Sequence, residues 1–120
     1  VRDCLHPRDI APLLLQQIDF RSEAKSRTIN LAGGHDNTMS LRELSDWCAE
    51  KIGPASPAND PNQISSDSSS RPFDIPWAIL DAGLARNAWG WKPATTLPQI
   101  LEEIDSHAQA NPKWLELVAG

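Results

Sequence analysis

Residues 27–53 read RTINLAGGHDNTMSLRELSDWCAEKIG, and this stretch decides the fold class. Its first part, residues 27–32, is a short β-prone run that ends in two glycines, which predicts a strand followed by a turn. Ser40 precedes Glu43 by three residues, the spacing of a capping box, and apolar residues then recur at helical spacing. The stretch therefore predicts a strand, a turn and a helix over residues 41–52.

The segments on either side of this stretch add one helix, one strand and one loop. Apolar residues recur at helical spacing over residues 10–18, and Asp9 is the expected N-cap of that helix. Residues 53–70 are rich in Ser and Pro and predict a mobile loop. Residues 75–80 are apolar and predict a second strand.

Two further helices are expected near the C-terminus. Asp81 is the expected cap of a short helix that Gly90 ends, and Thr96 with Gln99 forms a second capping box before the final helix. The fold class is therefore α/β, with few short strands and about four helices. Because a sheet usually needs three or more strands to be stable, this count suggests that strands are missing or come from a partner.

Composition excludes several classes of function. The chain has 120 residues, 40% of them hydrophobic and 22% charged, which is typical of a soluble globular domain. The longest apolar run, residues 10–15, is too short for a membrane span. The net charge of −5 and the absence of a basic cluster argue against nucleic acid as a partner. No secretory or lipidation signal is evident, so a cytoplasmic location is expected.

The reactive side chains exclude further chemistry. The chain has five Trp but no Tyr, so it supplies no phenol as an acid or base. Its two cysteines, Cys4 and Cys48, and its three histidines show no metal-ligand spacing, so no metal site is expected.

Five motifs occur in a recognisable order: RDCLHPRD at residues 2–9, INLAGG at 29–34, NTMSLREL at 37–44, RPFD followed by Asp81 at 71–81, and WGWKP at 89–93. In this order they resemble the extended short-chain dehydrogenase/reductase (SDR) family, the NAD-dependent nucleotide-sugar epimerases and dehydratases. The resemblance is strongest to CDP-paratose (tyvelose) 2-epimerases and also extends to UDP-galactose 4-epimerases.

This resemblance implies the C-terminal, substrate-binding portion of such an enzyme, with the N-terminal Rossmann domain missing. Residues 1–36 would be the last helix and strand of the Rossmann domain. Residues 37–120 would be the C-terminal subdomain, with the mobile loop inside it. The family uses NAD, bound by Gly-x-x-Gly-x-x-Gly, and a catalytic Tyr-x-x-x-Lys pair. Neither motif is present, so this chain alone is expected to bind no NAD, to carry no catalytic residue and to be inactive.

The resemblance also implies a set of substrate-binding residues. Arg2 and Arg71 would hold the nucleotide diphosphate from opposite sides, because guanidinium groups bind phosphates with bidentate, charge-assisted hydrogen bonds. Asp74 would accept hydrogen bonds from the ribose hydroxyls. Trp77 is a candidate for the wall of the sugar pocket. Pro76 stands where the 2-epimerases commonly have an arginine, so the resemblance does not identify which sugar is bound.

The expected partners are a nucleotide sugar, the missing Rossmann domain and further copies of this chain. Self-association is expected through exposed apolar side chains of the first helix, namely Leu13, Leu14, Leu15 and Ile18. Two alternatives stay open beside the epimerase segment. One is a stand-alone, non-catalytic nucleotide-binding module, and the other is an oligomerisation or interaction domain whose chains exchange strands.

Overall fold

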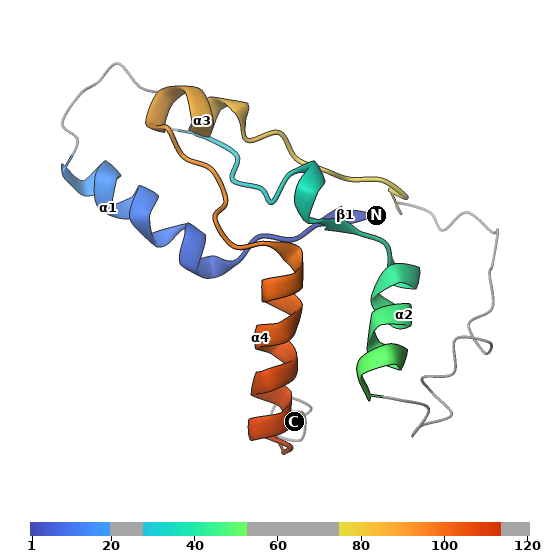
Figure 1. The fold of residues 1–120 in the computed structure, drawn as a ribbon. Coiled ribbons are helices and arrows are strands. Elements are labelled where there is room, and N and C mark those ends of the chain that lie inside the picture. The colour runs from blue at the N-terminus through green and yellow to red at the C-terminus, as the bar shows by residue number, and fades with distance from the viewer. Residues whose placement is uncertain (20–27, 53–74, 114–120) are drawn as a thin grey trace.

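The fold is a mixed α/β arrangement that is mostly helical. A computed structural model describes residues 1–19, 28–52 and 75–113. In chain order the elements are β1 (Arg2–Asp3), η1 (Pro7–Asp9), α1 (Ala11–Asp19), η2 (His35–Asn37), β2 (Thr38–Met39), α2 (Leu41–Ile52), α3 (Gly83–Trp89) and α4 (Leu97–Ala110) (Figure 1). The four α-helices within these ranges agree with the expected helix content. The predicted loop at residues 53–70 lies outside the described residues.

The sheet has two short strands. β1 pairs antiparallel with β2, so that Arg2 lies opposite Met39 and Asp3 opposite Thr38. On its other side Arg2 forms a single parallel bridge with Ala78. β1 is therefore the segment that joins the β2 region to the chain around residue 78.

The strands predicted at residues 27–32 and 75–80 are wrong as far as the structure describes them. Residues 28–32 carry no strand, although partly buried Ile29 and Leu31 alternate with exposed Thr28 and Asn30, and residues 75–80 hold only the bridge at Ala78. The local pattern of a strand is present in the first segment. A strand also needs a hydrogen-bonded neighbour, which no local pattern supplies.

Local capping signals correctly predicted α2 and α4. The N–H of Ser40 donates to Glu43 Oε2 at 2.6 Å, and the N–H of Glu43 donates to Ser40 Oγ at 3.1 Å. At the start of α4, the N–H of Thr96 donates to Gln99 Oε1 at 2.9 Å. These contacts satisfy N–H groups that a helix start leaves without an intrahelical partner.

The other two helices differ in detail from the prediction. α1 begins at Ala11, and Asp9 belongs instead to the preceding 3-10 helix η1. α3 begins at Gly83, whose N–H donates to Asp81 Oδ1 at 2.8 Å. Gly90 ends α3 in the left-handed region, at φ 64°, as the sequence predicts.

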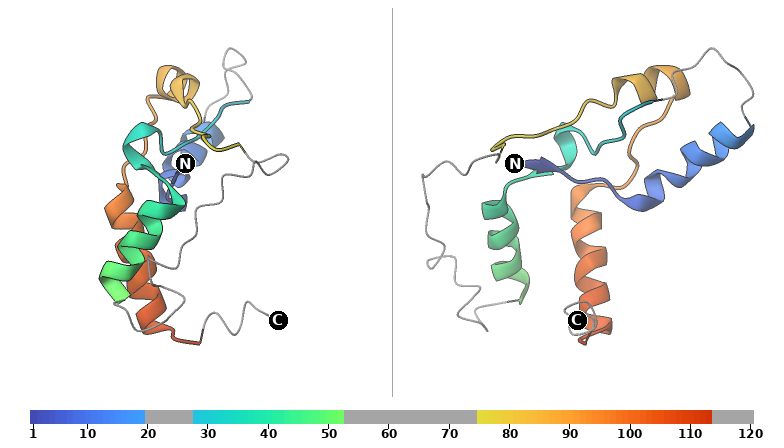
Figure 2. Two further views of the ribbon diagram at one scale, coloured as in Figure 1. Left: turned by 90° about the vertical axis from the view of Figure 1, so that its right-hand side faces the viewer. Right: turned by 180° about the vertical axis from the view of Figure 1, so that it is seen from behind.

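The main cluster of buried apolar side chains lies where α1, α3 and the loop after α3 meet. Leu13 is 1% exposed, Ala85 0% and Trp91 7%, and Leu5, Ile29, Leu31, Ala82 and Trp89 pack around them. Figure 2 shows α2 and α4 projecting to the same side, away from α1 and α3. No helix among the described residues is long and apolar enough to cross a membrane.

Candidate functional site

β1 places Arg2 against a segment that is distant in sequence. The Val1 ammonium donates to the carbonyl of Pro76 at 2.6 Å, and the N–H of Ala78 donates to the carbonyl of Val1 at 3.1 Å. Together with the bridge between Arg2 and Ala78, these bonds hold residues 75–78 beside the N-terminal strand.

A groove of about 470 Å³ opens beside Arg2 at this junction. Most of its lining is apolar and comes from three segments of the chain. The lining residues are Val1, Arg2, Cys4, Met39, Ser40, Leu41, Leu44, Ile75 and Pro76. We call this cavity the Arg2 groove. It combines the Arg2 guanidinium with mostly apolar walls, the composition of a site for a small organic anion.

Arg2 is the cationic group of the Arg2 groove. Arg2 is exposed, and its Nη1 donates a hydrogen bond to the Val1 carbonyl at 2.8 Å. The Cys4 thiol lies in the same lining, where burial first and the neighbouring Asp3 charge second raise its pKa. The thiol is therefore protonated at neutral pH and acts as an apolar wall rather than as a nucleophile.

Three more residues were predicted to bind the substrate. Arg71 and Asp74 lie outside the described residues, but Ile75, which follows Asp74 in the sequence, lines the Arg2 groove. Trp77 is 60% exposed and is not one of the lining residues of the Arg2 groove. Its role in a sugar pocket stays a prediction.

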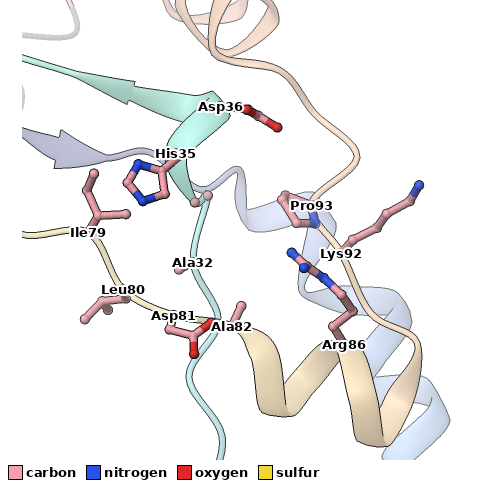
Figure 3. A pocket seen from close by; sticks show the side chains of 12 residues that line it. Ala32, His35, Asp36, Ile79, Leu80, Asp81, Ala82, Arg86, Lys92 and Pro93 are labelled. Atoms are coloured by element: carbon pink, nitrogen blue, oxygen red, sulfur yellow. The ribbon is translucent and has the colours of Figure 1, made fainter.

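A second cavity, of about 550 Å³, surrounds the Gly33–Gly34 turn (Figure 3). Its lining comprises Ala32, Gly33, Gly34, His35, Asp36, Ile79, Leu80, Asp81, Ala82, Arg86, Lys92 and Pro93. We call it the glycine-turn cavity. Sequence reasoning missed this site, because its polar groups come from segments about fifty residues apart and only the paired glycines gave a local signal.

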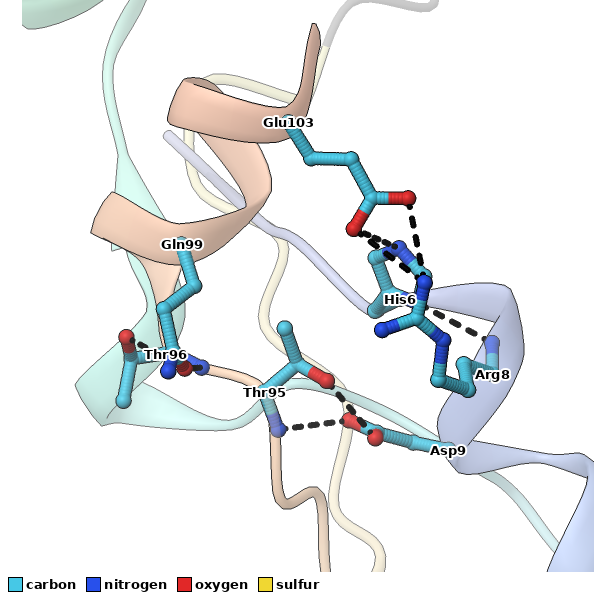
Figure 4. Close-up of polar contacts among 7 residues, drawn as sticks. All are labelled: His6, Arg8, Asp9, Thr95, Thr96, Gln99 and Glu103. Carbon is cyan, nitrogen blue, oxygen red and sulfur yellow. Dashed lines mark hydrogen bonds and ion pairs between the residues drawn. The ribbon is translucent and has the colours of Figure 1, made fainter. Parts of the chain in front are cut away.

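Asp9 holds the loop before α4 in place (Figure 4). Its carboxylate accepts hydrogen bonds from Ala94 N–H at 3.0 Å, Thr95 N–H at 3.0 Å and the Thr95 hydroxyl at 2.8 Å. Burial raises the pKa of Asp9, but these bonds, with a smaller contribution from the nearby His6, outweigh burial and lower its pKa below the ordinary value. Asp9 is thus a structural carboxylate, and the predicted N-cap role is wrong.

His6 and Arg8 contact the same carboxylate on α4, as Figure 4 shows. His6 Nε2 lies 3.3 Å from Glu103 Oε2, and Arg8 Nη2 lies 3.3 Å from Glu103 Oε1. His6 Nδ1 accepts the N–H of Arg8 at 3.0 Å. Both ring nitrogens therefore have protein partners, which is the pattern of a structural histidine.

Comparison of the chain with protein-family models, with curated proteins and with solved structures finds no match. Among residues 1–19, 28–52 and 75–113 there is no group of three or more His, Cys, Asp or Glu side chains that could hold a metal ion.

Proposed function

We propose that this chain binds the nucleoside diphosphate part of a nucleotide sugar in the Arg2 groove. In this proposal it is the substrate-binding segment of an NAD-dependent epimerase or dehydratase of the extended SDR type. One observation carries the proposal. The bonds between Val1 and residues 76 and 78 bring Arg2 next to the segment that directly follows Arg71 and Asp74.

The chemistry of the Arg2 groove supports this ligand. A guanidinium at the edge of an apolar cavity binds a diphosphate through paired hydrogen bonds, while the apolar wall contacts a flat base. Met39, Leu44 and Ile75 provide such a wall. The volume of about 470 Å³ falls within the range of small-ligand sites, about 300–1,000 Å³.

The proposed role is recognition, without chemistry on this chain alone. Sugar epimerisation through NAD needs a group that removes a hydroxyl proton during hydride transfer, and the sequence contains no Tyr for that task. In the proposal, NAD and the catalytic pair belong to a Rossmann domain that this chain would accompany.

Isothermal titration of the purified chain tests the proposal. CDP, UDP and dTDP are the probes, and NAD is the control ligand. We expect saturable binding of at least one nucleoside diphosphate and none of NAD. Arg2→Gln and Arg71→Ala should each weaken that binding by roughly tenfold or more, because each removes a charge-assisted contact.

Arg86→Gln is the matched control, since Arg86 lines the other cavity. It should bind the nucleoside diphosphate as the unmodified chain does. Absence of binding by all three probes, or equal losses in Arg2→Gln and Arg86→Gln, would contradict the proposal.

A second candidate function is self-association through α1. Leu14 is 52% exposed, Leu15 66% and Ile18 76%, so three large apolar side chains on one helix face solvent. Leu13, which was predicted to share this surface, is 1% exposed and belongs to the core instead. The helix periodicity turns Leu13 inward and leaves its neighbours outside.

Light scattering over a tenfold concentration range tests this second candidate. The chain should form a dimer or larger oligomer that Leu15→Glu dissociates and that Gln16→Glu, on the same helix, leaves intact. A monomer at every concentration would rule it out.

A further inference from the structure

The backbone of the Gly33–Gly34 turn forms part of the wall of the glycine-turn cavity. A Cβ on Gly33 would lie 1.9 Å from the Cys4 carbonyl oxygen, so the turn packs directly against the backbone that follows β1. Gly34 has φ 71°, and a Cβ there would meet nothing within 4 Å. The Gly34 carbonyl accepts Asn37 N–H at 3.2 Å, which fixes the turn. The turn is therefore supported by the backbone at Cys4 and by the bond from Asn37, and neither glycine has a side chain that would fill the cavity.

Arg86 provides a guanidinium that the described part of the chain leaves without an ion-pair partner. In contrast, Arg8 lies 3.3 Å from Glu103, and Arg42 lies 4.0 Å from Asp46. Figure 3 shows Arg86 reaching from α3 toward Pro93, on the side of the cavity opposite Ile79 and Leu80. Its donors are available to an oxyanion in the cavity, and a guanidinium matches a phosphate in a bidentate manner.

Two carboxylates in the lining restrict the kind of anion. Asp36 and Asp81 balance the charges of Arg86 and Lys92, so the charged side chains of the lining sum to zero. Asp81 uses Oδ1 for the Gly83 N–H at 2.8 Å, which leaves Oδ2 as an acceptor. Carboxylates repel a bare anion but accept hydrogen bonds from hydroxyl groups. The lining therefore favours a ligand with one anionic group and several hydroxyls.

From this arrangement we propose that the glycine-turn cavity binds a small phosphorylated polyol. Arg86 holds the phosphate, Asp36 and Asp81 accept hydrogen bonds from the hydroxyls, and Ile79 and Leu80 cover the carbon face of the ligand. The cavity volume of about 550 Å³ suits a ligand of monosaccharide size. This site is separate from the Arg2 groove and does not rest on the function proposed for it.

Titration of the ¹⁵N-labelled full chain, followed by NMR, tests the site with three probes: glucose 6-phosphate, glucose and inorganic phosphate. We expect saturable shifts of the Gly34, Asp36 and Ala82 amides with glucose 6-phosphate. Its affinity should exceed those of glucose and of phosphate by roughly tenfold or more, because each of these lacks half of the contacts.

Variants then assign the contacts. Arg86→Gln should weaken binding of glucose 6-phosphate by roughly tenfold or more. Arg86→Lys should weaken it by less, because an ammonium keeps the positive charge but loses the bidentate donor geometry of a guanidinium. Arg2→Gln is the matched control and should bind glucose 6-phosphate normally. Circular dichroism of each variant shows that the helices are retained.

Three results would overturn the proposal. They are no saturable shift with glucose 6-phosphate, equal affinity for inorganic phosphate, or unchanged binding in folded Arg86→Gln. Failure of the Arg2 groove proposal would appear instead as loss of nucleoside diphosphate binding with this site intact, so the two outcomes are distinguishable.

Discussion

The region around Asp9 and the Arg2 groove are held together in opposite ways. Around Asp9, side chains join segments more than eighty residues apart: Trp91 Nε1 donates to the Asp9 carbonyl at 2.7 Å, beside buried Leu13. The Arg2 groove is instead assembled from two-residue strands and exposed side chains, with Leu41 83% and Ile75 61% exposed. We call the first region, which comprises Asp9, Trp91, Ala94 and Thr95, the Asp9 hub.

This difference separates stability from recognition. The hub closes the fold through buried contacts, so changes there should unfold the protein. None of the groove's lining residues is fully buried, so changes there, apart from the α2 cap Ser40, should alter affinity and leave stability nearly unchanged. Substitutions of Trp91, Asp9 and Ser40 test the stability side of that separation.

Trp91→Ala should cause the largest loss of stability. Trp91 is 7% exposed, packs in the core and donates its indole N–H to the hub. Truncating a buried Trp typically lowers the free energy of unfolding by about 3–5 kcal/mol. Urea denaturation measures the loss. Trp77→Ala is the matched control, because Trp77 is 60% exposed and should cost less than about 1 kcal/mol. Equal losses in the two variants would contradict the assignment of Trp91 to the buried core.

Asp9→Ala should lower the free energy of unfolding by about 2–3 kcal/mol at pH 7, since it leaves the N–H groups of Ala94 and Thr95 without their acceptor. The loss should depend on pH. The pKa of Asp9 is lowered in the folded state, so its contribution is present above the unfolded-state pKa of about 3.9 and disappears as the pH falls through the folded-state pKa.

Urea denaturation of both proteins at pH 7, 4 and 3 follows this dependence. The difference between the unmodified chain and Asp9→Ala should shrink as the pH falls below about 4. A difference that stays constant would show that the charge of Asp9 plays no part.

Ser40→Ala should have the smallest effect of the three, about 1 kcal/mol, because it removes one half of the α2 capping box. Ser106→Ala, in the exposed middle of α4, is the matched control and should be neutral or slightly stabilising. Thermal denaturation followed by circular dichroism compares the two. A larger loss in Ser106→Ala would argue against a capping role for Ser40.

The parts of the fold that sequence predicted correctly are those fixed by neighbours in the chain. The capping boxes at Ser40 and Thr96 and the left-handed Gly90 depend on residues within a few positions, so local patterns located α2, α4 and the end of α3. Asp9 shows the limit. A carboxylate before a helix accepts N–H groups either from that helix or from a distant loop, and the local sequence is the same in both cases.

The candidate sites follow the same rule. Sequence indicated Arg2 through a motif, and the structure adds that residues 75–78 lie beside it. The glycine-turn cavity was not predictable, because Arg86 and Gly34, far apart in sequence, line one cavity only in the folded chain. Nothing in the spacing of these residues along the chain signals that encounter.

The most direct test of the Arg2 groove is to map where a nucleoside diphosphate binds. The ¹⁵N-labelled chain is titrated with CDP and with UDP, and the amide shifts are assigned. Binding in the Arg2 groove predicts that the largest shifts fall on Arg2, Cys4, Ser40 and Ile75 and that Arg2→Gln weakens this binding by roughly tenfold or more. Shifts confined to Gly34, Ala82 and Arg86, or no saturable shift with either nucleotide, would contradict it.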